Sequence, residues 1–290
     1  REGKLLNQTV ELFPSEILGV LRRRAVHAPD ALDAAVAELE EKFTAVPVHA
    51  VAGAAEKGTI VYGSSTEIGG DFAPSSWWTN NATDKLIRDL TNDYGITVTN
   101  QGGEYVVNDT VCKDLTSVVN DDGSKTFTVT INEGLTYNNG EEIKAADFLW
   151  AEVFSCSKVA MDTGAKLTGH LTYVGGKDYY DGTATAVSGI RLIDDYTFSV
   201  TILADKIPYY YDLNYISLKP FSLKYWLGEG VELKDDGEGC YIAGDFTKEG
   251  IEKQLEYARF NAGEDRVSAG PYIPLHRLVV NVAGQERPRI

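Results

Sequence analysis

A stretch of strict alternation constrains the fold of this chain more than any other feature. Phe127, Val129 and Ile131 alternate with threonines over residues 126–131. A period of two predicts a β-strand with one buried and one solvated face. The turn-forming sequence NDDG precedes this strand at residues 120–123, and such a sequence favours a tight connection to an earlier strand. The region therefore predicts an antiparallel hairpin.

Further strands and helices are predicted on both sides of this hairpin. Residues 190–202 form a second hairpin pattern, with its turn at Asp194-Asp195. Helices are predicted over 145–154, 220–227 and 248–261, and Gly228 should end the second of them in a left-handed conformation. Strands and helices mix without regular alternation, which predicts a mixed α/β fold.

Composition and charge exclude several classes of protein. Of the 290 residues, 43% are hydrophobic and 24% are charged, as in globular domains, so wholesale disorder is excluded. The net charge of −16 argues against nucleic acid or an anionic membrane surface as the main partner. No run of about 18 apolar residues occurs, so no transmembrane helix is expected.

Differences in residue composition and pattern divide the chain into three parts. Residues 1–56 are predicted to be a helical leader and linker, with an amphipathic helix that carries Leu32, Val36, Leu39 and Phe43. Residues 57–272 hold the short strands and helices of the main domain. Residues 273–290 should form one strand followed by a polar tail. We expect the whole to be a segment of a longer protein.

The chain lacks the usual sequence signatures of enzymes and metal sites. It has no nucleophile elbow, zinc-protease helix, P-loop or dinucleotide-binding glycine pattern. Its three cysteines, Cys112, Cys156 and Cys240, have no metal-ligand spacing and are expected to be buried, inert thiols. The two Asp-Asp-Gly sequences, at 121–123 and 235–237, are interpreted as turns rather than calcium loops. We expect no catalysis, no cofactor and no metal.

A set of motifs in a fixed order nevertheless resembles a known family. Residues 125–150 read KTFTVTINEGLTYNNGEEIKAADFLW, which resembles the signature stretch of the family 5 extracellular solute-binding proteins, the peptide-binding components of ABC importers. Four later segments resemble further motifs of that family: residues 174–179 (VGGKDY), 194–200 (DDYTFSV), 218–222 (LKPFS) and 269–272 (AGPY). The resemblance covers residues 57–272.

The resemblance implies a periplasmic-binding-protein-like (type II) fold of which this chain holds lobe I, incomplete without the second lobe. It also implies a receptor that captures a peptide or another small solute and delivers it to an ABC transporter permease. The family's positions that hold the peptide termini lie mainly in the second lobe and have no counterpart here. Isolated lobes expose apolar surface, so a weak homodimer is also expected.

The ligand-binding residues predicted from the resemblance and from the aromatic content lie near the start of the lobe. The family's lobe approaches its ligand at the loop after the first strand, here Ser64, Ser65, Thr66 and Glu67. Trp77 and Trp78 are predicted to form walls of the pocket, because aromatic side chains with a polar tip give a large contact area. The same residues could simply pack the core.

Two other functions remain open at this point. The segment could be an extracellular, lobe-like insertion in a larger ABC transporter permease, where it would act as a docking or scaffold module. A carbohydrate-binding or hydrolytic protein is the third possibility, since a glycosidase needs only two facing carboxylates. Both transport hypotheses place the protein at the extracellular face of a bacterial cell membrane, membrane-anchored or part of a membrane protein.

Overall fold

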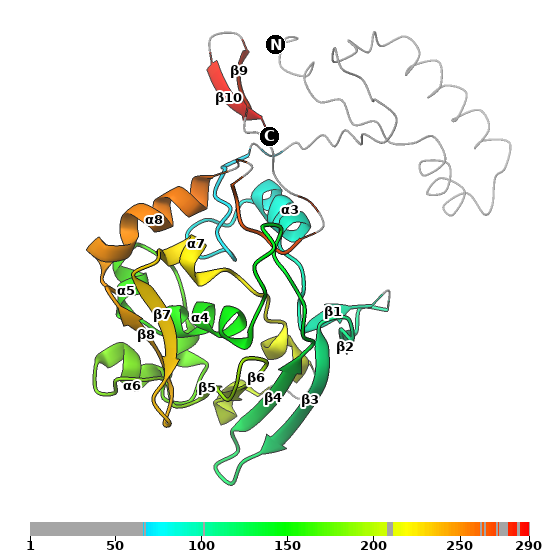
Figure 1. The fold of residues 1–290 in the computed structure, drawn as a ribbon, viewed down its shortest axis with the longest axis vertical. Coiled ribbons are helices and arrows are strands. Elements are labelled where there is room, and N and C mark those ends of the chain that lie inside the picture. Colours follow the sequence, from blue (N-terminus) through cyan, green and yellow to red (C-terminus); the bar gives the residue numbers. More distant parts are fainter. Residues whose placement is uncertain are drawn as a thin grey trace, which may run out of the picture. The chain divides into compact units, whose positions relative to one another are not determined.

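The computed structural model describes Thr66 and residues 68–289, with gaps at 101, 208–210, 262, 264, 271, 273–277 and 283–284. The predicted helix over residues 30–43, the predicted boundary at residue 57 and the predicted site residues Ser64, Ser65 and Glu67 lie outside the described residues. For residues 278–289 only the backbone is described. Figure 1 shows the chain as a mixture of short helices and antiparallel strand pairs, as the sequence predicts.

A four-stranded antiparallel sheet, with strand order β3-β4-β6-β5, forms one side of the core. Its strands are β3 (Cys112–Val119), β4 (Lys125–Ile131), β5 (Ile190–Leu192) and β6 (Thr197–Ile202). Both predicted hairpins are confirmed: β3 pairs with β4 and β5 pairs with β6. Phe127 lies opposite Val200 and Val129 opposite Phe198, and all four are buried. The threonines of β4 occupy the other, partly exposed face.

Helix α4 (Ala145–Ser155) passes through the middle of the domain (Figure 1). Eight of its eleven residues are buried, and it contacts β5 and β6 of the sheet and the hairpin of β7 (Val231–Asp235) and β8 (Cys240–Gly244). A helix that is apolar on every side is one that neighbours cover on every side. The predicted helix 145–154 is thus confirmed, one residue longer at its end.

The helix predicted over residues 220–227 is shorter in the structure. Helix α7 (Leu223–Leu227) begins after Ser222, whose hydroxyl accepts a hydrogen bond from the backbone N–H of Tyr225. Phe221 stays outside the helix, because its N–H donates to Asp147 O and its carbonyl accepts from the Trp150 indole. The expectation for Gly228 is wrong in detail: its φ of 101° is positive, but its ψ of 168° is extended rather than left-handed helical.

The remaining elements flank this core. Helix α8 (Lys248–Phe260) matches the predicted 248–261 and packs on α7. Strand β9 (Leu278–Val282) lies where a strand was predicted, and the polar end after it forms a second strand, β10 (Gln285–Arg289). The other elements of the described chain are α3 (Ala82–Thr91), β1 (Thr97–Thr99), β2 (Tyr105–Val107), α5 (Lys158–Asp162), α6 (Gly176–Asp181), and the short 3-10 helices η1 (Gly169–Leu171), η2 (Ala204–Lys206) and η3 (Asp212–Ile216).

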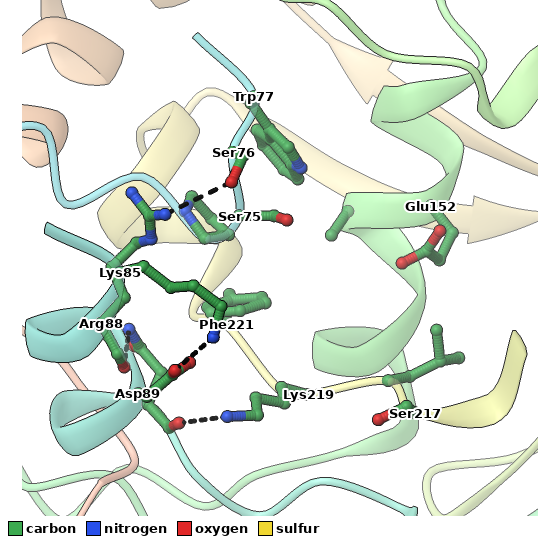
Figure 2. Close-up of a pocket in the computed structure, with 14 residues that line it drawn as sticks. Ser75, Ser76, Trp77, Lys85, Arg88, Asp89, Glu152, Ser217, Lys219 and Phe221 are labelled. Atoms are coloured by element: carbon green, nitrogen blue, oxygen red, sulfur yellow. Dashed lines mark hydrogen bonds and ion pairs between the residues drawn. The ribbon is translucent and has the colours of Figure 1, made fainter. Parts of the chain in front are cut away.

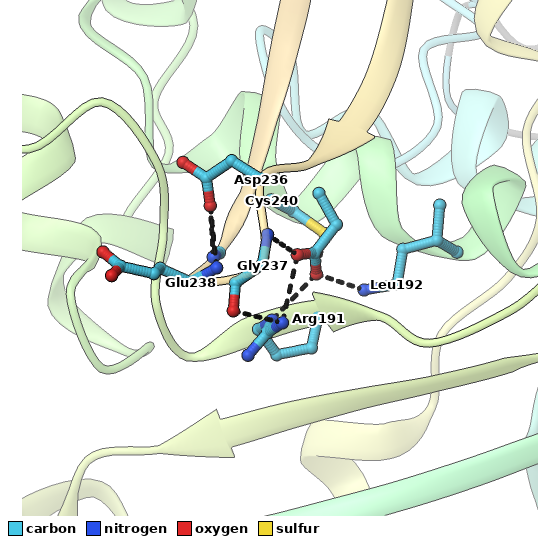
Figure 3. A network of polar contacts seen from close by, with 8 residues as sticks. Arg191, Leu192, Asp236, Gly237, Glu238 and Cys240 are labelled. Carbon is cyan, nitrogen blue, oxygen red and sulfur yellow. Dashed lines mark hydrogen bonds and ion pairs between the residues drawn. The ribbon is translucent and has the colours of Figure 1, made fainter.

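The Asp-Asp-Gly sequence at residues 235–237 is a turn, as interpreted from the sequence. The Asp235 carboxylate accepts hydrogen bonds from the Arg191 guanidinium, from Leu192 N and from Gly237 N at 2.8–3.1 Å (Figure 3). Asp236 accepts from backbone N–H groups within the same turn. Asp235 therefore holds β5 against the β7–β8 hairpin, and Asp236 stabilises the turn itself.

All three cysteines are buried free thiols, as expected. Burial raises the pKa of each thiol, to about 12 for Cys240, where the neighbouring Asp235 carboxylate adds to the effect. A thiol with so high a pKa is a poor nucleophile at neutral pH. The structure thus gives these residues a packing role.

Candidate functional site

The described part of the chain contains a pocket of about 260 Å³ between α3, α4 and the segment before α7 (Figure 2). Its lining residues come from four segments of the sequence: Pro74, Ser75, Ser76 and Trp77; Lys85, Arg88, Asp89 and Asn92; Ala151 and Glu152; and Ser217, Leu218, Lys219 and Phe221. Sites for drug-sized ligands measure roughly 300–1,000 Å³. The pocket therefore suits a small solute or one end of a larger ligand.

One wall is the loop of residues 68–80, which buried charges hold in place. The Asp84 carboxylate, at the start of α3, accepts hydrogen bonds from Gly69 N at 2.9 Å and Gly70 N at 3.0 Å. A Cβ atom on Gly69 would lie 2.6 Å from Asp84 Oδ2, so a larger residue at this position would displace the Asp84 carboxylate. Farther along the loop, Asp71 forms an ion pair with Arg259 of α8 at 2.8 Å. Both carboxylates fix the course of the loop toward Trp77.

Helix α3 forms the second wall through a polar face. The Asn81 side chain caps the helix by accepting from Thr83 N and Asp84 N. The helix buries Thr83, Asp84, Arg88 and Thr91, while its leucines face outward. Arg88 is only 4% exposed and donates to Asp71 O at 3.2 Å and to Ser76 Oγ at 3.4 Å (Figure 2). The buried polar groups of α3 thus join the helix to the loop.

Helix α4 supplies the opposite wall, with Glu152 facing the pocket (Figure 2). One oxygen of its carboxylate, Oε2, accepts a hydrogen bond of 2.7 Å from the buried Tyr173 hydroxyl. Burial raises the pKa of Glu152, and the hydrogen bond from Tyr173 opposes this effect. No cation of the described residues lies within 4 Å of Glu152, since it forms none of their ion pairs.

The segment 217–221 closes the pocket between these walls. Leu218 O accepts from Ile96 N at 3.0 Å, and the Lys219 ammonium donates to Asn92 O at 2.8 Å. Phe221 is bonded to α4 through Asp147 and Trp150, as described above. This segment includes the LKPFS motif of the sequence analysis, so that motif has a definite structural place.

The two predicted tryptophans have different surroundings. Trp77 is 7% exposed, stacks on Phe154 with 5.1 Å between ring centroids and borders the pocket with part of its surface. Trp78 does not line the pocket: its indole N–H donates to Thr163 O at 3.1 Å, and the Arg259 guanidinium lies 4.2 Å above its ring. Of the predicted loop residues, the structure describes only Thr66, which is exposed and is not among the lining residues.

The charged residues of the pocket carry no sequence signal. Glu152 stands within an apolar helix, and Arg88 and Lys219 stand in ordinary polar surroundings, so no motif distinguishes them. Only the packing of α3 against the loop and of α4 against segment 217–221 brings the three side chains to one pocket.

The pocket presents hydroxyl, carboxylate, guanidinium, ammonium and aromatic groups. The lining residues include neither histidine nor cysteine, and the carboxylate of Asp89 is paired with Lys85. Among the residues that the structure describes, no group of three or more His, Cys, Asp and Glu could hold a metal ion. In the same residues, no helix is long and apolar enough to cross a membrane.

Comparisons with known proteins give structural matches only. No family model matches the sequence, and no curated protein matches it. Solved structures that match include Listeria monocytogenes OppA bound to peptide (TM-score 0.42, 17% identity, 64% of this chain and 38% of that chain). Lactococcal OppA with an endogenous peptide in the closed conformation matches with a TM-score of 0.49 and 16% identity, over 76% of this chain and 35% of that chain.

A periplasmic oligopeptide-binding protein from Borrelia burgdorferi matches with a TM-score of 0.42 and 18% identity, over 64% of this chain and 39% of that chain. The three matched proteins are named as oligopeptide-binding or peptide-bound proteins. This chain spans between 35% and 39% of the length of these structures.

Proposed function

We propose that this chain is the first lobe of an extracellular solute-binding protein that captures peptides for an ABC importer and performs no catalysis. The proposal rests on the position, in the structure, of the motifs that resemble those of solute-binding proteins. The stretch 125–150 provides the capped start of α4, whose following residues Ala151 and Glu152 line the pocket, and residues 218–222 contribute Leu218, Lys219 and Phe221 to the lining. One resembling motif thus lines the pocket and another leads directly into it, which is expected of a binding protein.

The AGPY motif has a place beside the same pocket. Gly270 N donates to Thr91 O at 2.9 Å, and a Cβ atom on Gly270 would lie 2.3 Å from the Thr91 carbonyl carbon. Only glycine allows the chain to pass so close to the end of α3, which forms one wall of the pocket. The motif thus supports the wall against which a ligand would lie.

Peptide would be held by the polar groups of the pocket and by its aromatic surfaces. Trp77 and Phe221 offer apolar contact, and Ser75 and Ser217 offer hydroxyl groups. In this proposal the loop Ser64–Glu67 and Trp77 contact the ligand, and Trp78 supports Trp77, 5.7 Å away between ring centroids. The partners are the second lobe, which would close over the ligand, and a permease at the extracellular face of the membrane.

A thermal-shift screen tests the solute class. The full chain is heated with a tryptic digest of casein, with maltotriose or with a nickel–histidine chelate. A ligand present at about 100 times its dissociation constant stabilises a protein by about 2.7 kcal/mol, which shifts the melting temperature by several degrees. We expect a shift with the peptides alone. A shift with maltotriose or the chelate alone would contradict the proposal of a peptide receptor.

A variant that fills the pocket tests the location. Ser217 is exposed at the pocket, so Ser217→Trp should block it without disturbing the core, and the peptide-dependent shift should disappear. Asn214→Trp places the same side chain on the exposed side of η3, outside the pocket, and should retain the shift. Equal shifts in the two variants would place the binding site elsewhere.

A further inference from the structure

The pocket brings together three charged side chains that have no partner of opposite charge. A charge away from water is costly unless a partner of opposite charge or several hydrogen bonds compensate it, as three carbonyls do for Arg266. Glu152, Arg88 and Lys219 form no ion pair within the described residues. All three line the same pocket.

Each of the three makes hydrogen bonds only to neutral groups. Glu152 accepts from the Tyr173 hydroxyl through Oε2 alone. Arg88 donates to a backbone carbonyl and to a serine hydroxyl, which uses two of the five N–H donors of a guanidinium. Lys219 donates one hydrogen bond, to the backbone carbonyl of Asn92. Each group therefore retains capacity for a charged partner.

The opposite charges stand on opposite sides of the pocket. Figure 2 shows Glu152 on α4 across the pocket from Arg88 on α3, with Lys219 on the segment that joins the two walls. The other two charged lining residues, Lys85 and Asp89, neutralise one another in an ion pair. The net pattern is an acid at one side and two cations at the other.

We infer that this pocket binds a small zwitterion, a free amino acid or a dipeptide, with its ammonium at Glu152 and its carboxylate at Arg88 and Lys219. The inference rests on the proposed function and deepens it, because it assigns both charged ends of the ligand to this lobe. The volume of about 260 Å³ suits a ligand of this size. Guanidinium and ammonium groups are the usual partners of carboxylates.

Three related probes separate the two ends of the ligand. The full chain is titrated calorimetrically with alanyl-alanine, with N-acetyl-alanyl-alanine, which lacks the ammonium, and with alanyl-alanine amide, which lacks the carboxylate. A hydrogen-bonded ion pair in such a site corresponds to about 10- to 100-fold in affinity. We expect either modification to weaken binding by about that factor.

Two variants then assign the ends to residues through double-mutant cycles. In Glu152→Gln, alanyl-alanine should bind about 10- to 100-fold more weakly, and N-acetylation should cause no further loss. In Lys219→Gln, amidation should cause a smaller loss than in the parent. Lys219 is half-buried and Glu152 borders the pocket, so both replacements should fold; Arg88 also anchors the loop and is left unchanged. The exposed Glu256 and Lys113 give matched controls, Glu256→Gln and Lys113→Gln.

The outcomes distinguish this inference from the proposed function. If N-acetylation weakens binding equally in the parent and in Glu152→Gln, the ammonium does not lie at Glu152 and the inference is wrong. If casein peptides bind but alanyl-alanine does not at millimolar concentration, the zwitterion assignment is wrong while the proposed function stands. If neither binds, the proposed function fails and this inference fails with it.

Discussion

Arg266 illustrates how much of this fold depends on single buried side chains. The residue is 1% exposed, and its guanidinium donates to three carbonyls: Ala258 O and Asn261 O at the end of α8, and Phe72 O in the loop beside the pocket. The guanidinium also lies 5.4 Å from the centroid of the Trp226 ring and 5.9 Å from that of the Tyr225 ring. Burial lowers the pKa of Arg266, yet the carbonyls at a helix C-terminus favour a cation there.

Replacing Arg266 should therefore destabilise the domain strongly. In Arg266→Met the three carbonyls lose their donor, and we expect the free energy of unfolding to fall by about 3 kcal/mol or more, measured by urea denaturation. Arg266→Lys should recover only part of the loss, because an ammonium lacks the planar fork that reaches several acceptors. Lys253→Met, on the exposed side of α8, is the control and should change little. A loss below 1 kcal/mol in Arg266→Met would contradict this role.

Helix α4 depends on a half-buried acid in its first turn. Asp147 belongs to the motif stretch 125–150, and its carboxylate accepts a hydrogen bond from Lys144 N at 2.8 Å, as in a capping box. Burial raises the pKa of Asp147 to about 7, although the hydrogen bond from Lys144 N acts in the opposite direction. The motif residue thus has a structural explanation.

The raised pKa of Asp147 predicts a pH dependence of stability. The folded state binds this proton more tightly than the unfolded state, in which the carboxyl titrates near 3.8. Stability contributed by Asp147 is therefore greatest at acid pH and falls as the pH rises from about 4 to 7, by up to about 4 kcal/mol. Urea unfolding at pH 5 and pH 7.5 should show this fall in the parent and a smaller one in Asp147→Asn. If stability falls as much with pH in Asp147→Asn as in the parent, Asp147 is not the group that causes the fall. Asp162→Asn, at an exposed position, is the control and should behave as the parent does.

The elements differ in how far the sequence predicts them, and the difference has a physical cause. The two hairpins and α4 were predictable because their apolar residues face the core with the period of a strand or form a continuous run. Helix α3 was not predicted from the sequence, because its amphipathic pattern is inverted. Its buried face is polar and bonds to a loop, while Leu86 and Leu90 are 44% and 50% exposed.

The site was less predictable than the fold. Trp77 borders the pocket, but its burial against Phe154 is what a core residue would also show. Glu152, Arg88 and Lys219 come from segments far apart in sequence, and their importance lies in the charges that they leave unpaired. Unpaired charge is a property of tertiary contacts, so a single sequence contains no signal for it.

At the scale of the whole molecule, the leucines that α3 exposes in the described part of the chain predict self-association. We expect a weak two-fold dimer with antiparallel α3 helices, in which Leu86 meets Leu90 of the second copy. A two-fold contact of this kind joins the same surface of both copies and is therefore self-complementary. Light scattering at high protein concentration should show this dimer.

Leucine replacements inside and outside the proposed contact test the dimer. Leu86→Gln combined with Leu90→Gln should abolish association, whereas Leu171→Gln, which changes a leucine 46% exposed in η1, should not. A parent protein that stays monomeric at high concentration, or a dimer that persists in the double variant, would contradict the proposed contact.

A lobe that binds alone should hold its ligand weakly. A two-lobed receptor closes over its ligand and contacts it from both sides, whereas one lobe offers only its own surface. We therefore expect dissociation constants in the micromolar range or weaker for this chain. A submicromolar value would mean that the chain holds a complete site or completes one by association.

Native mass spectrometry of the freshly purified full chain, compared with denaturing mass spectrometry, tests most directly whether this protein binds peptides. The sample is measured as isolated and after addition of the casein digest, for the parent and for Ser217→Trp. We predict additional masses that correspond to peptides in the native spectrum of the parent, absent after denaturation and absent in Ser217→Trp. Bare protein in every native spectrum, even with a large excess of the digest, would contradict the proposed function.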